Sequence, residues 1–243
     1  MLEAISSDHV GFNGYHRRDI TPHLDTLAKN SLIFPNAYAP SNHSNYAQTS
    51  ISSSQYPRRR NHLDMFQTID YPKTLLFDVL GHYGYETALF SSQNENWQGM
   101  RRFLLTNSKI DTFFHSPDAL GENIKIETKL DDAFTRQKAQ EFIASRTSTK
   151  LLFLALNFQR THFPYSLNSK EPGPYQPTDI QGKFAFFNYS PKEAPKVINK
   201  FDTALRYVDS QVGLFIQFLK KQGLYDDAII LVMPDHGEAF YQN

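Results

Sequence analysis

The sequence predicts an α/β fold with a mainly parallel sheet and helices on both of its faces. Two observations carry this prediction: amphipathic helical segments alternate with short strand-like segments along the chain, and the longest apolar segments lack the polar alternation of a half-solvated sheet. The chain has 243 residues, of which 40% are hydrophobic, so it contains enough apolar side chains for one large domain spanning residues 1–243.

The first half of the chain contains two predicted helix and strand pairs. Residues 21–29 begin with Thr-Pro, a pair suited to a helix start, and carry apolar residues on one face. Residues 31–34 then favour a short strand. Residues 73–80 indicate a second amphipathic helix, which two nearby glycines end, and residues 87–90 indicate the strand that follows it.

The second half continues the alternation with longer elements. Residues 130–145 favour a helix, and residues 150–156 form an apolar segment typical of a buried strand. Residues 172–191 are rich in Pro, Gly and aromatic residues and predict a long surface loop. Residues 194–222 carry apolar side chains at helical spacing up to a glycine stop, and residues 229–233 predict a final strand that is buried on both faces.

Composition excludes several classes of function. Lys plus Arg equals Asp plus Glu at 25 each, so no net charge favours nucleic acid, and the short run Arg58 to Arg60 does not change this. The absence of cysteine excludes disulfides, thiolate zinc sites and a cysteine nucleophile. No signal peptide or membrane span is recognisable. Because little strand precedes Glu3 and few residues follow Asp235-His236, we expect the chain to be truncated at both ends.

The end of the last predicted strand carries an Asp-His-Gly motif. In open α/β sheets ligands lie beyond the carboxyl ends of the strands, and there the carboxylate of Asp235 and the imidazole of His236 are suited to hold a divalent metal. The alternative is that Asp235 caps the next element and His236 lies at the surface. The motif alone does not decide between them, because short motifs have many chance matches.

A series of further motifs adds to this one. Its blocks, which are specific only in combination, are Asp8-His9-Val10-Gly11, Thr21-Pro22-His23-Leu24-Asp25, Asn36-Ala37-Tyr38, Gln55-Tyr56-Pro57-Arg58-Arg59, Thr161-His162-Phe163-Pro164-Tyr165, Arg206-Tyr207-Val208-Asp209 and Asp235-His236-Gly237-Glu238. In order and spacing, this series resembles the sulfatase branch of the alkaline phosphatase superfamily, over nearly the whole chain.

The resemblance assigns roles to individual residues. It implies that Glu3, Asp235 and His236 are ligands of a divalent ion, which is Mn, Mg, Ca or Zn. It places Ser44 at the position of the nucleophile, where the hydroxyl also contacts the metal and loses its proton more readily. It matches His162 to a histidine that approaches the anionic group or the leaving oxygen of the substrate, as a hydrogen-bond donor.

The sequence also departs from true sulfatases. Those enzymes carry Cys or Ser followed by x-Pro-x-Arg, the signal for conversion to formylglycine, whereas Ser44 is followed by Asn-Tyr-Ala-Gln. The Lys-Trp-His block that sulfatases place after Gly-Tyr-x-Thr is missing as well. An unmodified hydroxyl nucleophile instead resembles the phosphotransferases of the superfamily, such as lipoteichoic acid synthases and phosphoethanolamine transferases, which use Thr at this position.

Three functions therefore compete. The first is a metal-dependent hydrolase or transferase of phosphate esters that uses Ser44, acting on a lipid or glycan head group. The second is a sulfuric ester hydrolase, and the third is a non-catalytic sulfatase-like binding or regulatory domain. For the first function we expect a periplasmic or extracytoplasmic domain whose parent is anchored in the inner membrane, with an anionic ester as partner and no nucleic acid.

Overall fold

The computed structural model describes residues 1–56, 66–165, 173–185 and 188–240. They group into two compact units. The sheet unit comprises Met1 and residues 39–159, and the α7 unit comprises residues 2–38 and 160–243. The expectation of one domain over residues 1–243 stays a prediction. The run Arg58 to Arg60 lies outside the described residues.

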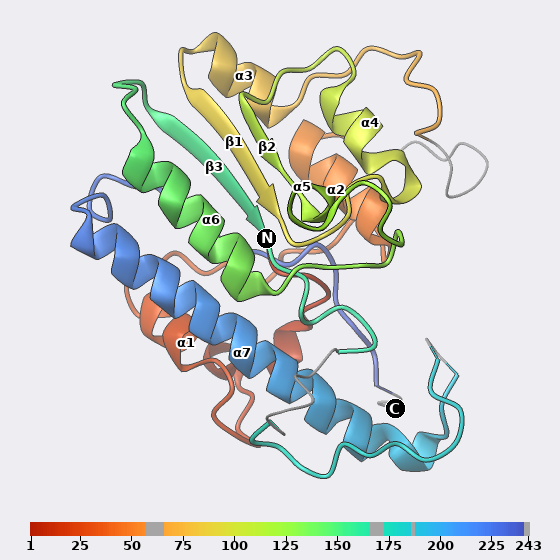
Figure 1. Ribbon diagram of the computed structural model, residues 1–243. Helices are drawn as coiled ribbons and strands as arrows, with labels where there is room; N and C mark the ends of the chain where they lie inside the picture. Colours follow the sequence, from red (N-terminus) through yellow and green to blue (C-terminus); the bar gives the residue numbers. More distant parts are fainter. Residues whose placement is uncertain (57–65, 166–172, 186–187, 241–243) are drawn as a thin grey trace. The chain divides into compact units, whose positions relative to one another are not determined.

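The sheet unit contains three parallel strands: β1 (Glu86–Ser91), β2 (Thr112–Phe114) and β3 (Leu152–Asn157), in the order β2-β1-β3 (Figure 1). Leu89 of β1 lies opposite Phe113 of β2 and Ala155 of β3, which fixes the register. The parallel sheet is as predicted, and β1 and β3 correspond to two of the predicted strands. The sequence analysis missed β2, which is only three residues long.

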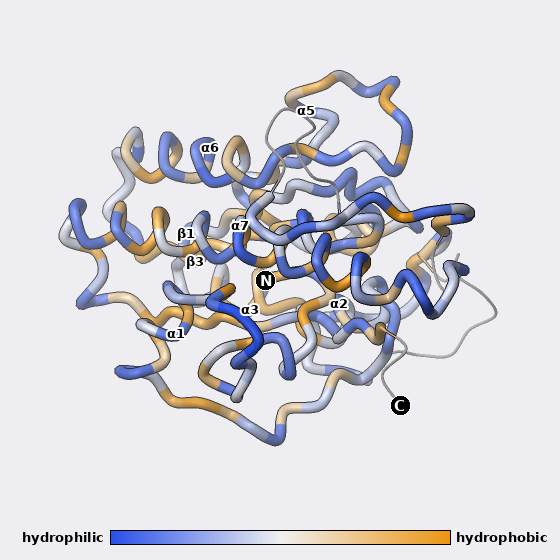
Figure 2. The backbone as a smooth tube through the Cα atoms, turned by 90° about the horizontal axis from the view of Figure 1, so that it is seen from below, coloured by the Kyte–Doolittle hydropathy of each residue, from blue (hydrophilic) through white to orange (hydrophobic). Residues whose placement is uncertain are grey.

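Helices lie on both faces of this sheet. The helices of the sheet unit are α2 (Ser44–Ser53), α3 (Leu76–His82), η3 (Trp97–Gly99), α4 (Met100–Leu105), α5 (Ser116–Leu120) and α6 (Asp132–Ser145). Phe77 of α3 packs against Phe153 with ring centroids 5.0 Å apart, and Phe142 of α6 packs against Phe90 at 5.4 Å. The side chains of Phe153 and Phe90 point to opposite faces, because successive strand residues alternate. Accordingly, α3 and α6 flank the strands from two sides (Figure 2).

The main apolar core of the sheet unit lies on the α3 side. It contains Leu89 from β1, with Phe113 and Ala155 packed against it from the neighbouring strands. Its buried members are Phe66, Leu75, Phe77, Leu89, Met100, Phe103, Leu104 and Ile110. On the opposite face, hydrophobic and hydrophilic residues alternate along α6, as a helix with one face on a sheet requires (Figure 2). The Asp131 side chain caps α6 by accepting a hydrogen bond from Ala133 N at 2.9 Å.

The α7 unit contains a long helix with a short one beside it. Its helices are η1 (Ser7–His9), η2 (Gly11–Asn13), α1 (Pro22–Ala28), η4 (Pro191–Glu193) and α7 (Ala194–Lys221). Both α-helices match predicted helices, and α1 lies along α7 (Figure 1). The contact depends on Gly213, because a Cβ there would lie 2.4 Å from Cγ of the His23 ring. A side chain at position 213 would therefore displace α1.

Two predicted strands are wrong. Residues 31–34 and 229–233 form no strand, and the apolar side chains of Leu32, Ile229 and Leu231 are exposed rather than buried. The physical reason is the lack of a ladder: neither segment pairs with a described strand, and an isolated bridge between Leu2 and Pro234 lies just after the second segment. The predicted helix 73–80 begins later, at Leu76, and the described part of the predicted loop 172–191 is irregular, as expected. Among the described residues, no helix is long and apolar enough to cross a membrane.

Candidate metal centre

Three side chains of the α7 unit converge on one point. Ligand atoms of Glu3, Asp235 and His236 all lie within 4.8 Å of one another. His236 Nε2 lies 3.7 Å from Glu3 Oε1 and 3.7 Å from Asp235 Oδ2. Both carboxyl groups are buried, and His236 is 9% exposed. Two carboxylates and an imidazole at these distances are the only such group of three among the residues that the structure describes.

The backbone brings the two ends of the sequence together at this point. Leu2 N donates to Met233 O at 3.0 Å, and Leu2 and Pro234 form a parallel bridge. Ala4, in the left-handed region with φ 52°, donates its N–H to Asp235 Oδ1 at 3.0 Å. The same oxygen accepts from His236 N at 2.9 Å. Asp235 is thus fixed through Oδ1 by two backbone groups.

One carboxylate oxygen of the cluster lacks a hydrogen-bond partner. Asp235 Oδ2 is buried and has no hydrogen-bond partner. His236 Nδ1 lies 2.8 Å from Gly237 O, and because a carbonyl only accepts, Nδ1 carries the proton. In the neutral ring, Nε2 then presents its lone pair toward the two carboxylates. Two carboxylates and an imidazole nitrogen at this spacing suit a cation, and an outer hydrogen bond of this kind is typical of metal-binding histidines.

The electrostatics agree with this geometry. Burial, followed by the charge of Glu3, raises the pKa of Asp235 from 3.8 to about 6. Burial also raises the pKa of the nearby Glu238 from 4.5 to about 7. A divalent ion would compensate buried negative charge of this kind, so the residues present fit a metal of the class that binds oxygen and imidazole ligands.

Further motif residues surround the cluster. Thr161 Oγ1 donates to the backbone carbonyl of Glu3. Tyr165, fully buried at φ 56°, donates its hydroxyl to the Glu238 carboxylate. Ser6 Oγ donates to Glu238 O at 2.6 Å and accepts from Glu238 N at 3.0 Å. The sequence analysis gave no role to these residues, although Thr161, Tyr165 and Glu238 stand in the quoted motifs.

Two other motifs meet at the start of α1. The Asp209 carboxylate on α7 accepts from Leu24 N at 2.8 Å and from His23 N at 3.1 Å. Asp209 therefore caps α1 from a distance in sequence, which explains why the Thr21 side chain makes no cap hydrogen bond. Thr21 Oγ1 instead accepts from Gly11 N at 2.8 Å and donates to Asp25 at 3.1 Å. Thr21 thus occupies the N-cap position that the Thr-Pro start predicts, but its side chain does not supply the cap hydrogen bond.

The two predicted catalytic residues, His162 and Ser44, belong to different units. His162 belongs to the α7 unit, is half-buried, and its Nδ1 contacts Phe163 O. Ser44 belongs to the sheet unit, where it is the first residue of α2 and is 7% exposed. Their catalytic roles, and the metal-binding roles of Glu3, Ser44, Asp235 and His236, stay predictions.

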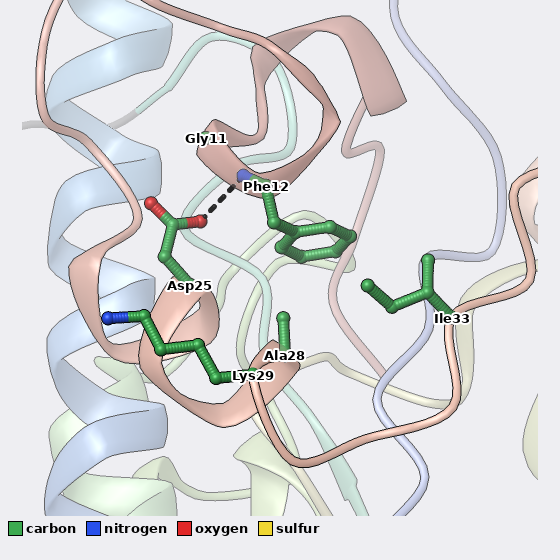
Figure 3. A pocket seen from close by; sticks show the side chains of 6 residues that line it. All are labelled: Gly11, Phe12, Asp25, Ala28, Lys29 and Ile33. Atoms are coloured by element: carbon green, nitrogen blue, oxygen red, sulfur yellow. Dashed lines mark hydrogen bonds between the residues drawn. The ribbon is translucent and has the colours of Figure 1, made fainter.

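A separate hollow of about 390 Å³ lies beside α1 and contains none of the predicted site residues (Figure 3). Its walls are Gly11, Phe12, Asp25, Ala28, Lys29 and Ile33. Asp25 accepts from Phe12 N at 2.9 Å, and a Cβ on Gly11 would lie 2.1 Å from Asp25 Oδ2. Only glycine at position 11 permits this approach. The hollow is shallow and partly apolar, and it offers no group of metal ligands.

Comparison with known proteins gives a family and several relatives. The family model described as Sulfatase matches residues 1–243. Over 224 residues the chain is 23% identical to the lipoteichoic acid synthase-like protein YvgJ of Bacillus subtilis (strain 168), and the match covers 90% of this chain and 33% of that protein.

Two solved structures share the fold. One is the lipoteichoic acid synthase LtaP from Listeria monocytogenes, with a TM-score of 0.74 and 20% identity over 98% of this chain and 55% of that one. The other is the periplasmic domain of EptC from Escherichia coli in complex with Zn, with a TM-score of 0.67 and 17% identity over 100% of this chain and 64% of that one. The chain thus spans between about a third and two thirds of the length of these relatives.

Proposed function

Because the chain belongs to the Sulfatase family of the alkaline phosphatase superfamily, we propose that it is a metal-dependent hydrolase or transferase of phosphate esters that uses Ser44 as its nucleophile. The observation that carries this proposal is the cluster of Glu3, Asp235 and His236, in which a carboxylate oxygen without a hydrogen-bond partner faces an imidazole lone pair. Members of this family are hydrolases or transferases, and a metal centre is the component their chemistry requires.

The metal centre would activate the serine nucleophile and the substrate ester. With two carboxylates and one imidazole, the donor set suits Mn, Mg, Ca or Zn, and the related EptC domain was solved with Zn. A bound ion lowers the pKa of a coordinated hydroxyl and polarises the ester oxygen. The chain's own contribution is to hold Asp235 through Ala4 N and to fix the His236 ring through Gly237 O.

Ser44 would carry the covalent step. Its hydroxyl would give its proton to solvent as Oγ forms a bond to phosphorus, while the bond from phosphorus to the leaving oxygen breaks and His162 donates a proton to that oxygen. Water or an acceptor hydroxyl would then attack the phosphoserine, giving its proton back to His162, and the released Ser44 oxygen would take a proton from solvent. The position of Ser44 at the first turn of α2 supports this role, since the positive end of a helix favours developing negative charge.

The substrate we propose is an anionic ester on a lipid or glycan head group. The relatives support this class: one is lipoteichoic acid synthase-like, and EptC from Campylobacter jejuni is a phosphoethanolamine transferase. The E. coli EptC domain is periplasmic, so we propose an extracytoplasmic location for this domain, with a parent protein held in the inner membrane. Balanced charge gives no support for a nucleic acid substrate.

Metal binding is the first test. We expect the purified chain to bind about one Mn or Zn ion, measured by elemental analysis and calorimetry, and Glu3→Gln to weaken that affinity by about a hundredfold. Glu127→Gln is the matched control, because Glu127 is an exposed glutamate of the sheet unit. A chain that binds no divalent ion would favour the non-catalytic alternative.

Turnover is the second test. Ser44→Ala should reduce hydrolysis of bis(p-nitrophenyl) phosphate about a thousandfold or more, while Ser52→Ala at the other end of α2 should retain it. Removal of metal with EDTA should reduce hydrolysis as much as Ser44→Ala does. Added metal should restore activity to the EDTA-treated native chain but not to Ser44→Ala. Full activity in Ser44→Ala contradicts the proposal. Formylglycine at position 44, detected by mass spectrometry, would instead favour the sulfuric ester hydrolase.

A further inference from the structure

A buried carboxylate in the sheet unit has no cationic partner among the residues that the structure describes. Glu95 follows the carboxyl end of β1 and is 2% exposed. Its Oε1 accepts hydrogen bonds from Ser91 Oγ at 2.5 Å and from Asn157 Nδ2 at 3.2 Å. Its Oε2 is buried and has no hydrogen-bond partner. Burial raises the pKa of Glu95, and the two neutral donors only partly oppose this effect, with no cationic side chain among the causes.

His115, which contacts the Glu95 backbone, does not neutralise the Glu95 carboxylate. His115 is 2% exposed, and its Nδ1 accepts a hydrogen bond from Glu95 N at 3.1 Å. Nδ1 therefore carries no proton, and the ring is neutral. Burial also lowers the pKa of His115, and its Nε2 lies 4.0 Å from Asp118 Oδ2. This imidazole is consequently occupied elsewhere and provides no positive charge to the carboxylate.

A second buried oxygen without a hydrogen-bond partner belongs to Gln93, two residues before Glu95 in the chain. Gln93 is 6% exposed, and its Oε1 makes no hydrogen bond. The Gln93 backbone N–H donates to Ser91 Oγ at 3.1 Å, the same hydroxyl that donates to Glu95. Ser91 and Asn157 lie opposite each other at the carboxyl ends of β1 and β3. Ligands of open parallel sheets lie at this edge.

We propose that Glu95 and Gln93 form a binding site for one compact monovalent cation. The single carboxylate matches a single positive charge, and the two oxygens without partners suit either a small inorganic cation or an ammonium group of an organic ligand. A water molecule would satisfy the hydrogen bonds but not the charge, which is expensive to bury alone. The site uses no residue of the Glu3, Asp235 and His236 cluster, so it does not depend on the proposed catalytic function.

The test measures thermal unfolding of the purified chain at constant ionic strength. The reference buffer contains tetramethylammonium chloride, whose cation we chose as too bulky for the site, and EDTA to remove divalent ions. In the test buffers this salt is replaced by potassium chloride, ammonium chloride or ethanolammonium chloride. We expect a saturable rise in the unfolding midpoint of about 5 °C at a cation concentration about 100-fold above Kd. A rise with potassium and ammonium alone identifies an inorganic cation, and a rise with ethanolammonium identifies an organic ammonium group.

Two variants locate the effect. Glu95→Gln keeps the shape but removes the charge, so the cation-dependent rise should vanish, while the exposed control Glu127→Gln should retain it. Gln93→Met keeps the charge and removes one oxygen, and should raise the Kd about tenfold. The proposal is overturned if no compact cation gives a saturable rise in the native chain, which is the result expected for a protonated Glu95. It is equally overturned if Glu95→Gln shows the same rise.

Discussion

Different kinds of contact stabilise the interior of the sheet unit and the interior of the α7 unit. In the sheet unit, three parallel strands and an apolar cluster around Phe103 dominate. In the α7 unit, fully buried carboxylates of α7 hold loops from the start of the chain: Asp202 accepts from His9 Nδ1 at 2.9 Å and from Tyr15 OH at 2.6 Å, and Asp209 caps α1. Apolar packing thus dominates the sheet unit, whereas the α7 unit combines an apolar helix face with specific polar contacts that periodicity does not reveal.

Among the substitutions that test this difference between the units, one in the apolar core should change the free energy of unfolding most. Phe103→Ala removes a side chain that is 1% exposed and packs on Phe66 with ring centroids 4.9 Å apart. We expect it to lower the free energy of unfolding by about 3–5 kcal/mol, because it leaves a cavity. Urea denaturation measures the loss, and hydrogen exchange should assign it to peptides of β1, β2 and α4.

A control in the same unit tests whether the loss depends on burial or only on removing an apolar side chain. Leu151 is also apolar but is 65% exposed, so Leu151→Ala should change the free energy of unfolding by about 0.5 kcal/mol or less. Similar losses for both variants would show that the cluster around Phe103 is not the main source of stability in the sheet unit.

A smaller effect is expected from the polar contacts of the α7 unit. Asp209→Ala leaves the N–H groups of His23 and Leu24 without their acceptor and should lower the free energy of unfolding by about 1–3 kcal/mol. Hydrogen exchange should increase in α1, whereas Asp226→Ala, at an exposed aspartate of the same unit, should leave it unchanged. Unaltered exchange in α1 would exclude Asp209 as its cap.

The same residue gives a pH dependence with a defined sign. Burial raises the pKa of Asp209 above 3.8 in the folded chain, so the folded state binds the proton more tightly than the unfolded state. The stability of the native chain relative to Asp209→Asn should be greatest below pH 3.8 and should decrease as pH rises through the folded pKa. Denaturation of both proteins at several pH values tests this. A difference that grows with pH would show that hydrogen bonding outweighs burial.

Sequence periodicity predicted the elements that have a continuous apolar face. These are β1, β3, α1, α6 and α7, each within a few residues of its observed bounds. It missed α2, whose ten residues include four serines and little apolar periodicity, and it missed the short β2. The parallel sheet with helices on both faces follows from the first group alone, and the structural relatives share this fold.

Sequence periodicity could not predict the candidate metal centre. Glu3 and Asp235 are 232 residues apart, and only the resemblance of the motifs to a family placed them in one site. The structure adds that their atoms lie close together and identifies what holds them, namely Ala4 N, Gly237 O and Thr161. These are mainly backbone groups, and backbone partners leave no residue-specific signal in a single sequence.

The smallest predicted effect concerns the segment where periodicity failed. Residues 229–233 are as apolar as a buried strand, yet Ile229 is 102% exposed. Ile229→Ala should therefore change the free energy of unfolding by about 0.5 kcal/mol or less, whereas Ile20→Ala, at 1% exposure in the same unit, should cost about 2–5 kcal/mol. Parallel urea titrations give both values. A loss at Ile229 comparable to that at Ile20 would mean that this segment is buried in solution, and the strand predicted from its sequence would then be correct.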